Sequence, residues 1–249
     1  MPPPRILTIA GSDSSGGAGI QADIKTITVL GGYAMSAITA ITAQNTVGVS
    51  AVEVLSAELV AAQIDACISD IGVDAIKLGM LGSPSIAAAV AERISALKVP
   101  IVFDPVMIAT SGAALADAAT IAAFERLMQL ATLTTPNLAE LAVLGGHEGM
   151  ATRGIAYLAK GGDGTSERVE DLLVLPGAEP QIMAGTRIHT RHTHGTGCTL
   201  SSAIATYLGK GLPLPEAVDR ARLFVRSALR AAPGFGAGAG PLGHGEARG

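Results

Sequence analysis

The chain has 249 residues, within the range of one large α/β domain, and carries a formal charge of −4 at pH 7. Aromatic residues make up 3% and charged residues 15% of it, so the interior must be built from Ala, Val, Ile and Leu, as in a parallel sheet covered by helices. The negative charge and the absence of a Lys/Arg cluster argue against nucleic-acid and membrane binding and favour small-molecule chemistry.

Short β-rich runs alternate with Ala-rich segments of helical period, which is typical of βαβ units and a mostly parallel sheet. The first half predicts strands at residues 5–10, 34–42, 51–54, 75–79, 99–103 and 131–134, and helices at 20–30, 58–71, from Pro84 onward and at 117–129. The second half predicts weaker strands at 155–160, 172–175 and 181–184, then helices at 196–208 and 215–231. The Gly-rich residues 233–249 are predicted to be a loop or a frayed end. No repeat or linker divides the chain, so we expect one domain over residues 1–249.

Two cysteines, Cys67 and Cys198, imply no disulfide framework and are compatible with a reducing compartment. No uninterrupted apolar span of about 20 residues occurs, as a membrane helix would require. We therefore expect a soluble, unprocessed, cytoplasmic protein.

The strongest local signal is the turn His194-Gly195-Thr196-Gly197-Cys198 before an Ala-rich helix. Glycines let backbone amides converge, and the positive end of the helix lies at the same place, which would make an anion hole. Cys198 falls in the first helical turn, where the dipole favours thiolate and would suit a base or nucleophile. An ordinary helix N-terminus with a buried cysteine would explain the same residues. A zinc site is a further alternative, with the ligands His189, His192, His194 and Cys198.

The glycine-rich loop 11–19 fits neither a P-loop nor the dinucleotide fingerprint. It would let the backbone approach a ligand at Gly11, with Asp23 one helical turn beyond the loop and aimed into the same cavity. A tight strand-to-helix turn is the simpler explanation.

Polar residues also follow other predicted strands, where ligand groups gather in open α/β sheets. Asn137 and Glu140 share one helical face and would hold hydrated magnesium, although a helix cap explains them equally. Lys160 would offer an ammonium to a phosphate, or be a solvated lysine before a turn. Gln44 carries an amide that donates and accepts at once, as a pyrimidine edge requires, or simply bonds within a loop.

The order of these motifs identifies a family where no single motif does. The series comprises the Gly-rich loop, Gln44-Asn45-Thr46, Lys77-Leu78-Gly79-Met80-Leu81, Asp104-Pro105-Val106-Met107, Thr135-Pro136-Asn137 with Glu140, Lys160-Gly161-Gly162 and the turn ending at Cys198. It resembles the hydroxymethylpyrimidine/phosphomethylpyrimidine kinases of thiamine biosynthesis, within the ribokinase-like superfamily. The likeness runs from Arg5 to about Pro241. It implies a three-layer α/β/α fold, ATP with Mg²⁺, and two successive phosphorylations that give a diphosphate ester.

The resemblance also implies a role for each matching residue. Gln44 looks like the reader of the pyrimidine edge, with Asp23, Met80, Val106 and Gly11 completing the substrate pocket. Cys198 takes the place of the catalytic residue, with the anion hole at Gly195, Thr196 and Gly197. Lys160 would meet the ATP phosphates, and Asn137 with Glu140 would hold magnesium through water, assisted by Asp104. We expect a small-molecule substrate, no nucleic-acid or membrane partner, and a homodimer.

The chain departs from the family's pattern in three places. The family usually has Asn where His192 stands, and His where Asp163 follows Lys160-Gly161-Gly162. The connection between Glu140 and Lys160 is also short. All three departures lie on the nucleotide side. Alternatives that remain are a pyridoxal or pyridoxine kinase of the same fold, which Gln44 and Met80 disfavour, and a non-catalytic pyrimidine-binding module.

Overall fold

A single nine-stranded sheet forms the centre of the computed structural model, which describes residues 2–108, 112, 115–162 and 164–247. The strand order is β3-β2-β1-β4-β5-β6-β7-β8-β9. The strands are β1 (Arg5–Asp13), β2 (Tyr33–Gln44), β3 (Val49–Val54), β4 (Ala75–Leu78), β5 (Ile101–Phe103), β6 (Leu133–Thr134), β7 (Tyr157–Ala159), β8 (Arg168–Val174) and β9 (Gln181–Thr186). Neighbouring strands from β2 to β7 pair in parallel, while β3, β8 and β9 pair antiparallel. The predicted mostly parallel sheet is confirmed.

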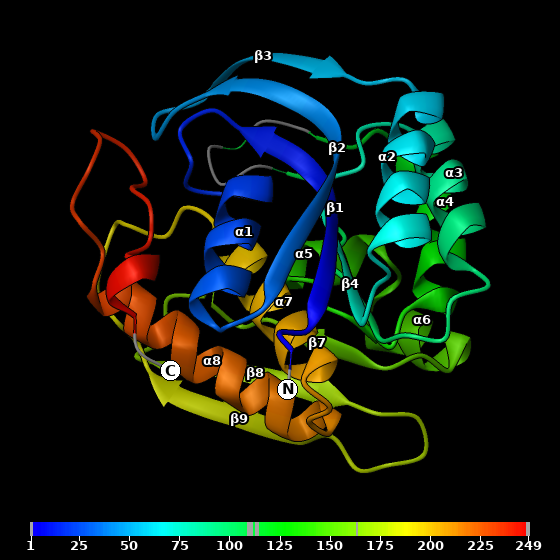
Figure 1. Cartoon of the computed structure of the whole chain (residues 1–249). Helices are drawn as coiled ribbons and strands as arrows, with labels where there is room; N and C mark the ends of the chain where they lie inside the picture. The colour runs from blue at the N-terminus through cyan, green and yellow to red at the C-terminus, as the bar shows by residue number, and fades with distance from the viewer. Residues whose placement is uncertain (1, 109–111, 113–114, 163, 248–249) are drawn as a thin grey trace.

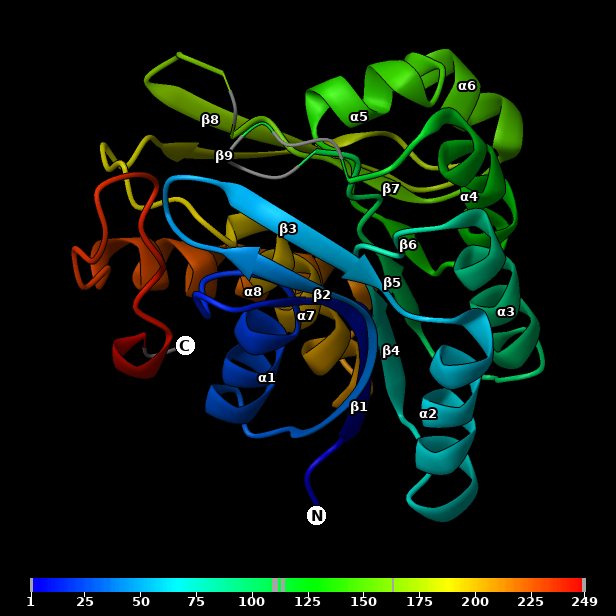
Figure 2. The same cartoon turned by 90° about the horizontal axis from the view of Figure 1, so that it is seen from above.

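Helices cover both faces of this sheet (Figures 1 and 2). One face carries α2 (Ala57–Asp70), α3 (Pro84–Ile94), α4 (Ala118–Leu130), α5 (Leu138–Val143) and α6 (Gly146–Arg153). The other carries α1 (Gly19–Val29), α7 (Thr196–Gly209) and α8 (Leu214–Arg230). Successive residues of β1 divide between the two cores, with Ile6 in one and Leu7 in the other, because strand side chains alternate between faces. The predicted three-layer α/β/α arrangement is confirmed.

The glycine loop differs from its prediction because β1 continues to Asp13 and shifts register after Ala10. This bulge carries Gly11 and Ser12 along β2 instead of releasing them into a loop. The backbone turns only between Ser14 and Ala18, before α1 begins at Gly19.

The C-terminal segment was expected to be a loop or a frayed end, and over the part that the structure describes it is mostly loop but is packed against the domain. It forms the 3₁₀ turn η1 (His244–Glu246) and buries Leu242 and His244. The imidazole of His244 lies 2.8 Å from the hydroxyl of Thr199 on α7. Glycine-rich composition therefore coexists with ordered packing, because these glycines allow backbone to approach backbone closely.

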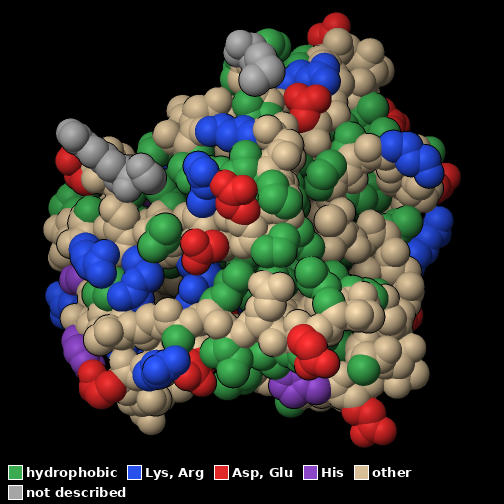
Figure 3. Space-filling view, turned by 90° about the horizontal axis from the view of Figure 1, so that it is seen from below, with side chains coloured by type: hydrophobic (Ala, Val, Ile, Leu, Met, Phe, Trp, Pro, Cys, Tyr) green, Lys and Arg blue, Asp and Glu red, His purple; other side chains and the backbone are tan. Residues whose placement is uncertain are grey.

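The surface and the helix lengths agree with the composition. On the face shown in Figure 3, basic and acidic side chains are interspersed among apolar ones. None of the helices that the structure describes has both the length and the apolar character needed to cross a bilayer.

Candidate functional site

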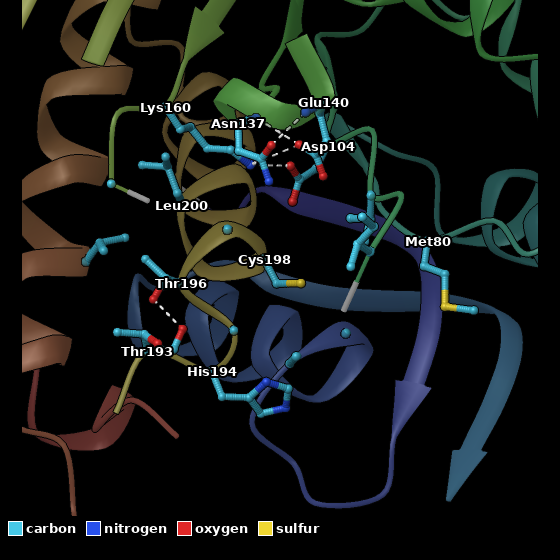
Figure 4. A pocket seen from close by; sticks show the side chains of 18 of the residues that line it. Met80, Asp104, Asn137, Glu140, Lys160, Thr193, His194, Thr196, Cys198 and Leu200 are labelled. Carbon is cyan, nitrogen blue, oxygen red and sulfur yellow. Dashed lines mark hydrogen bonds and ion pairs between the residues drawn. The ribbon is translucent and has the colours of Figure 1, made fainter. Parts of the chain in front are cut away.

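A cavity of about 740 Å³ opens at the carboxyl ends of the parallel strands and at the start of α7 (Figure 4). Side chains from both ends of the sequence line it, among them Gln44, Asp104, Asn137, Lys160 and Cys198. Strand ends and a helix N-terminus thus converge on one volume, as is typical of ligand sites in open α/β sheets. The residues predicted from separate motifs are brought together here.

The glycine turn at the start of α7 packs directly against the loop before α1. Gly195 has φ of +85°, and a Cβ there would lie 1.9 Å from the carbonyl oxygen of Gly17, so only glycine fits. A Cβ on Gly197 would lie 3.3 Å from the Lys160 ammonium. The Thr196 hydroxyl donates to the carbonyl of Thr193 at 2.6 Å and closes the turn. The first backbone amides of α7 are therefore presented beside a lysine, which suits an anion.

Cys198 lies in the first turn of α7, and its thiol lines the cavity. Burial raises the pKa of the thiol to about 11, although the positive charge of Lys77 opposes this rise. Burial therefore opposes the thiolate form that the helix dipole was expected to favour.

Four polar side chains cluster at the edge of the cavity nearest α5 (Figure 4). The Lys160 ammonium lies 2.7 Å from Asp104 Oδ1 and 4.0 Å from Glu140 Oε2. Asn137 and Glu140 form a capping box, in which each side chain accepts the other's backbone N–H at 2.8 Å. The helix-cap interpretation is thus confirmed for both residues. The second carboxylate oxygen of Glu140 is not used by the cap.

Glu140 has an unusual protonation equilibrium for a carboxyl group. Burial raises its pKa to about 7, with Lys160 lowering it and Asp104 raising it. A cation placed between the two carboxylates would favour the charged form of Glu140. These oxygen ligands are the kind that Mg²⁺ accepts, and two carboxylates with water suffice for it.

Four of the residues predicted to bind substrate line the same cavity. Gln44, Met80, Val106 and Gly11 all line it. A Cβ on Gly11 would lie 3.0 Å from the sulfur of Met80, so glycine leaves room for that side chain. The Thr42 hydroxyl donates to Gln44 Oε1 at 3.1 Å and orients the amide. The amide nitrogen also lies 3.4 Å from Nε2 of His194. One lone pair of the oxygen and one N–H remain for a ligand.

Asp23 does not line the cavity, contrary to the expectation that it completes the pocket. It is fully buried, and its carboxylate lies 2.8 Å from the ammonium of Lys77. Hydroxyls of Thr8 and Ser202 also donate to it, at 2.6 and 2.7 Å. These three partners hold the carboxylate away from the cavity. Lys77 lines the cavity instead.

The sequence did not predict that His194 pairs with Asp13, 181 residues away in the chain. The His194 imidazole lies 2.8 Å from Asp13 Oδ2, and both side chains are buried. Asp13 also accepts the backbone N–H groups of Gly17 and Ala18, so it joins the two glycine segments. The sequence offered only that Asp13 lies within the glycine-rich loop 11–19.

The histidines proposed as zinc ligands contact different partners and do not share one site. His194 is engaged by Asp13, and His189 lies 3.0 Å from Glu167 at the surface. A Cβ on Gly240 would lie 2.1 Å from Nδ1 of His192, which therefore packs against the C-terminal segment. Within the described residues, no group of three or more His, Cys, Asp or Glu side chains has metal-binding geometry.

The apolar part of the cavity was not predicted from the sequence. Apolar side chains from β8, α7, α8 and the segment after β9 line it: Val169, Ile188, Leu200, Val225 and Leu229. Asp171 fixes the nearby loop, because it accepts the N–H of Gly161 at 2.9 Å and the Arg222 guanidinium at 2.7 Å.

The short connection after Glu140 contains α6, which was not predicted. Asp163 lies outside the described residues.

Comparisons with known sequences give the same family as the motif order. The sequence profile described as phosphomethylpyrimidine kinase matches residues 13–243. The hydroxymethylpyrimidine/phosphomethylpyrimidine kinase of Rhizobium meliloti is 48% identical, over 96% of this chain and 96% of that protein. The thiamine biosynthesis bifunctional protein ThiED of Geobacter sulfurreducens is 45% identical, over 96% of this chain and 52% of that protein.

Solved structures extend the likeness to the whole fold. The phosphomethylpyrimidine kinase from Clostridium difficile matches with a TM-score of 0.76 and 39% identity, over 90% of this chain and 98% of that one. The pyridoxal kinase from Staphylococcus aureus in complex with AMP-PCP and pyridoxal matches with a TM-score of 0.87 and 32% identity, over 98% and 94%. The profile match and the full-length relatives together show that this chain belongs to the phosphomethylpyrimidine kinase family.

Proposed function

We propose that the protein transfers phosphate from ATP to 4-amino-5-hydroxymethyl-2-methylpyrimidine, and then to the resulting monophosphate, for thiamine biosynthesis. One observation carries this proposal: a single cavity is lined by the oriented amide of Gln44, by the Gly195–Gly197 turn and by Lys160. The amide suits an aminopyrimidine edge, and the turn suits phosphoryl groups. Membership of the family supports the same reaction.

The residues present fit ATP and Mg²⁺. The apolar half of the cavity offers a slot for a purine, with Leu200 and Val225 among its walls. Lys160 and the amides of the glycine turn would hold the polyphosphate, while Glu140 and Asp104 would hold Mg²⁺ through water, beside Asn137. When bound, the magnesium nucleotide supplies the phosphoryl group and offsets its charge.

Phosphoryl transfer depends on positioning and charge neutralisation more than on covalent chemistry. The amides of Gly195 and Gly197, together with Lys160, are placed to stabilise negative charge in both phosphorylations. Cys198 would act at the acceptor hydroxyl, whose proton must leave as its oxygen attacks. A monophosphate acceptor is already anionic at neutral pH and needs no such base. Cys198 should therefore matter chiefly for the first phosphorylation.

A second candidate function is pyridoxal phosphorylation, which the close structural match to a pyridoxal kinase favours. A pyridoxal ring also carries a hydroxymethyl group, but it lacks the aminopyrimidine edge that Gln44 and Met80 would contact. A pyrimidine-binding module without turnover is a third possibility, which the presence of Lys160, Asn137 and Cys198 in one cavity disfavours.

A coupled assay of ADP release tests these functions against one another. The purified protein, with ATP and Mg²⁺, is given hydroxymethylpyrimidine, its monophosphate, pyridoxine, pyridoxal or ribose. We expect release with the first two acceptors. Release with pyridoxal or pyridoxine alone would favour the second function. Calorimetric binding of hydroxymethylpyrimidine without ADP release would favour the non-catalytic module.

We also propose that the enzyme is a cytoplasmic homodimer. The outer face of β2 and β3 exposes apolar side chains that a second copy would cover, with Ile41 52% exposed and Ala43 and Ala51 exposed beside it. Cys67 and Cys198 are both free thiols, as a reducing compartment allows. Light scattering of the wild-type protein and of Ile41→Glu would test the dimer, which should dissociate in the variant.

A further inference from the structure

A buried ion pair lies beneath the cavity, where β1, β4, α1 and α7 meet. The Lys77 ammonium is 2.8 and 3.0 Å from the two carboxylate oxygens of Asp23, and neither side chain is exposed to solvent. Each Asp23 oxygen also accepts one hydroxyl, from Thr8 or from Ser202. The carboxylate is thus fixed by three side chains from three different elements.

Stability alone is a weak reason for this pair. Taking two charges out of water is costly, and well-packed apolar residues often replace such a pair without loss of stability. Lys77 is the single charged residue in the strand Ala-Ile-Lys-Leu of β4, whose residues are all fully buried. A leucine or methionine would suit that strand equally well, so the charge itself calls for a chemical explanation.

The pair is bonded to α7 one turn from Cys198. Ser202 follows Cys198 by one turn on the same face of α7, so its bond to Asp23 anchors the pair one turn beneath the thiol. Lys77 lines the cavity whereas Asp23 does not. A Cβ on Gly79 would lie 2.7 Å from the Lys77 ammonium, so the glycine leaves space for that group at the cavity floor.

Other charges also face Cys198, from the elements around it. Lys160 and Asp104 lie near it at the ends of β7 and β5 and form an ion pair with each other at 2.7 Å. The backbone amide of Gly19, at the start of α1, lowers the pKa of the thiol, as does Lys77, whereas burial, Asp23 and Asp104 raise it. The two members of the buried pair therefore act on the thiol in opposite directions.

We propose that Lys77 is a positioning residue for proton transfer, whose ammonium, fixed by Asp23, stabilises the thiolate form of Cys198 that accepts the proton of the substrate hydroxyl. The proposal rests on the kinase function proposed above. Cys198 first releases its proton to water. The acceptor O–H bond then breaks as an S–H bond forms, while the acceptor oxygen bonds to the transferred phosphorus and ADP leaves.

Because Lys77 and Asp23 shift the pKa of the Cys198 thiol in opposite directions, substitutions of the two residues distinguish this proposal from a purely structural role. Iodoacetamide modification of Cys198 is followed by mass spectrometry at fixed pH, in a Cys67→Ser background without nucleotide or acceptor. Lys77→Met should slow modification about tenfold or more, as a thiol pKa higher by one unit or more predicts. Asp23→Asn, which breaks the same ion pair but keeps the ammonium, should accelerate it. A merely structural pair would move both variants in the same direction.

Each outcome decides the proposal. Opposite changes in the two variants support it, and changes of the same sign or no change in either variant overturn it. If Lys77→Met does not fold, Asp23→Asn decides alone: faster modification supports the proposal, and unchanged or slower modification overturns it. Because the measurement uses the free enzyme, it stands even if ADP release with hydroxymethylpyrimidine fails. Opposite thiol changes without ADP release would therefore contradict only the proposed function.

Discussion

The acceptor end and the nucleotide end of the cavity are built in different ways. At the acceptor end, polar side chains are held by partners within the protein, as Gln44 is by Thr42 and His194 is by Asp13. At the nucleotide end, the walls are largely apolar and come from α8, α7 and the antiparallel strand β8. Oriented hydrogen bonds can reject a wrong ring, whereas an apolar slot selects mainly by shape. We expect acceptor choice to be strict and changes at the nucleotide end to have smaller effects.

Removal of the Cys198 thiol should have the largest effect, and only at the acceptor end. Cys198→Ala should slow phosphorylation of hydroxymethylpyrimidine about 100-fold or more, the usual contribution of a general base. Phosphorylation of the monophosphate should change less than about tenfold, because that acceptor is already anionic. Initial rates with each purified acceptor measure both steps, and Cys67→Ala is the matched control. Equal losses in the two steps would remove the base assignment.

Gln44→Leu should have the next largest effect. The variant removes the amide but keeps the size of the side chain, and it leaves the ring's polar edge unpaired. We expect kcat/KM for hydroxymethylpyrimidine to fall about 10- to 100-fold, the equivalent of one or two lost hydrogen bonds. The affinity for ADP, measured by calorimetry, should stay unchanged. A matching loss of ADP affinity would mean that the two ends are not independent.

Leu229→Gln is the reciprocal change at the nucleotide end. A polar amide in the apolar slot should raise the KM for ATP about tenfold, because burial of an unpaired polar group costs about 1–2 kcal/mol. The affinity for hydroxymethylpyrimidine should not change. An unchanged KM for ATP would place the purine elsewhere in the cavity.

The pH dependence of Mg²⁺ use should show the smallest effect. Burial raises the pKa of Glu140 to about 7, so its carboxyl group takes up a proton as the pH falls through 7. The apparent Mg²⁺ affinity should therefore fall about fourfold between pH 8 and pH 6.5, the ratio of ionised fractions. Titration of activity with Mg²⁺ at each pH measures this. Glu140→Gln should bind Mg²⁺ more weakly and without the pH dependence, whereas an unaltered profile would exclude Glu140.

The sequence revealed the polar side chains of the cavity better than its apolar wall, for a physical reason. Gln44, Asp104 and Asn137 stand at strand ends, where a polar residue is conspicuous against an apolar run. Val225 and Leu229 lie one turn apart on α8, where an apolar pair is indistinguishable from core packing. The prediction for Asp23 was wrong because its position near a glycine loop suggested a ligand contact. Its carboxylate pairs instead with Lys77, which lies 54 residues away in the sequence. Tertiary pairings of this kind leave no local signal in the sequence.

The fold followed its sequence prediction where hydrophobic period was strong and departed from it where glycine intervened. Helix α6 was missed because Gly146 and Gly149 lie within it and reduce its helical character. The last segment was expected to be a loop or a frayed end for the same compositional reason. It is mostly loop, yet Leu242 and His244 are buried beside α7 and α8.

The most direct test of the account follows the products of the unmodified protein. Hydroxymethylpyrimidine, ATP and Mg²⁺ are incubated with it, and the pyrimidine species are resolved by mass spectrometry over time. We predict that the monophosphate appears first and is then converted to the diphosphate by the same protein. If no phosphorylated pyrimidine forms while the same preparation phosphorylates pyridoxal, the account is contradicted.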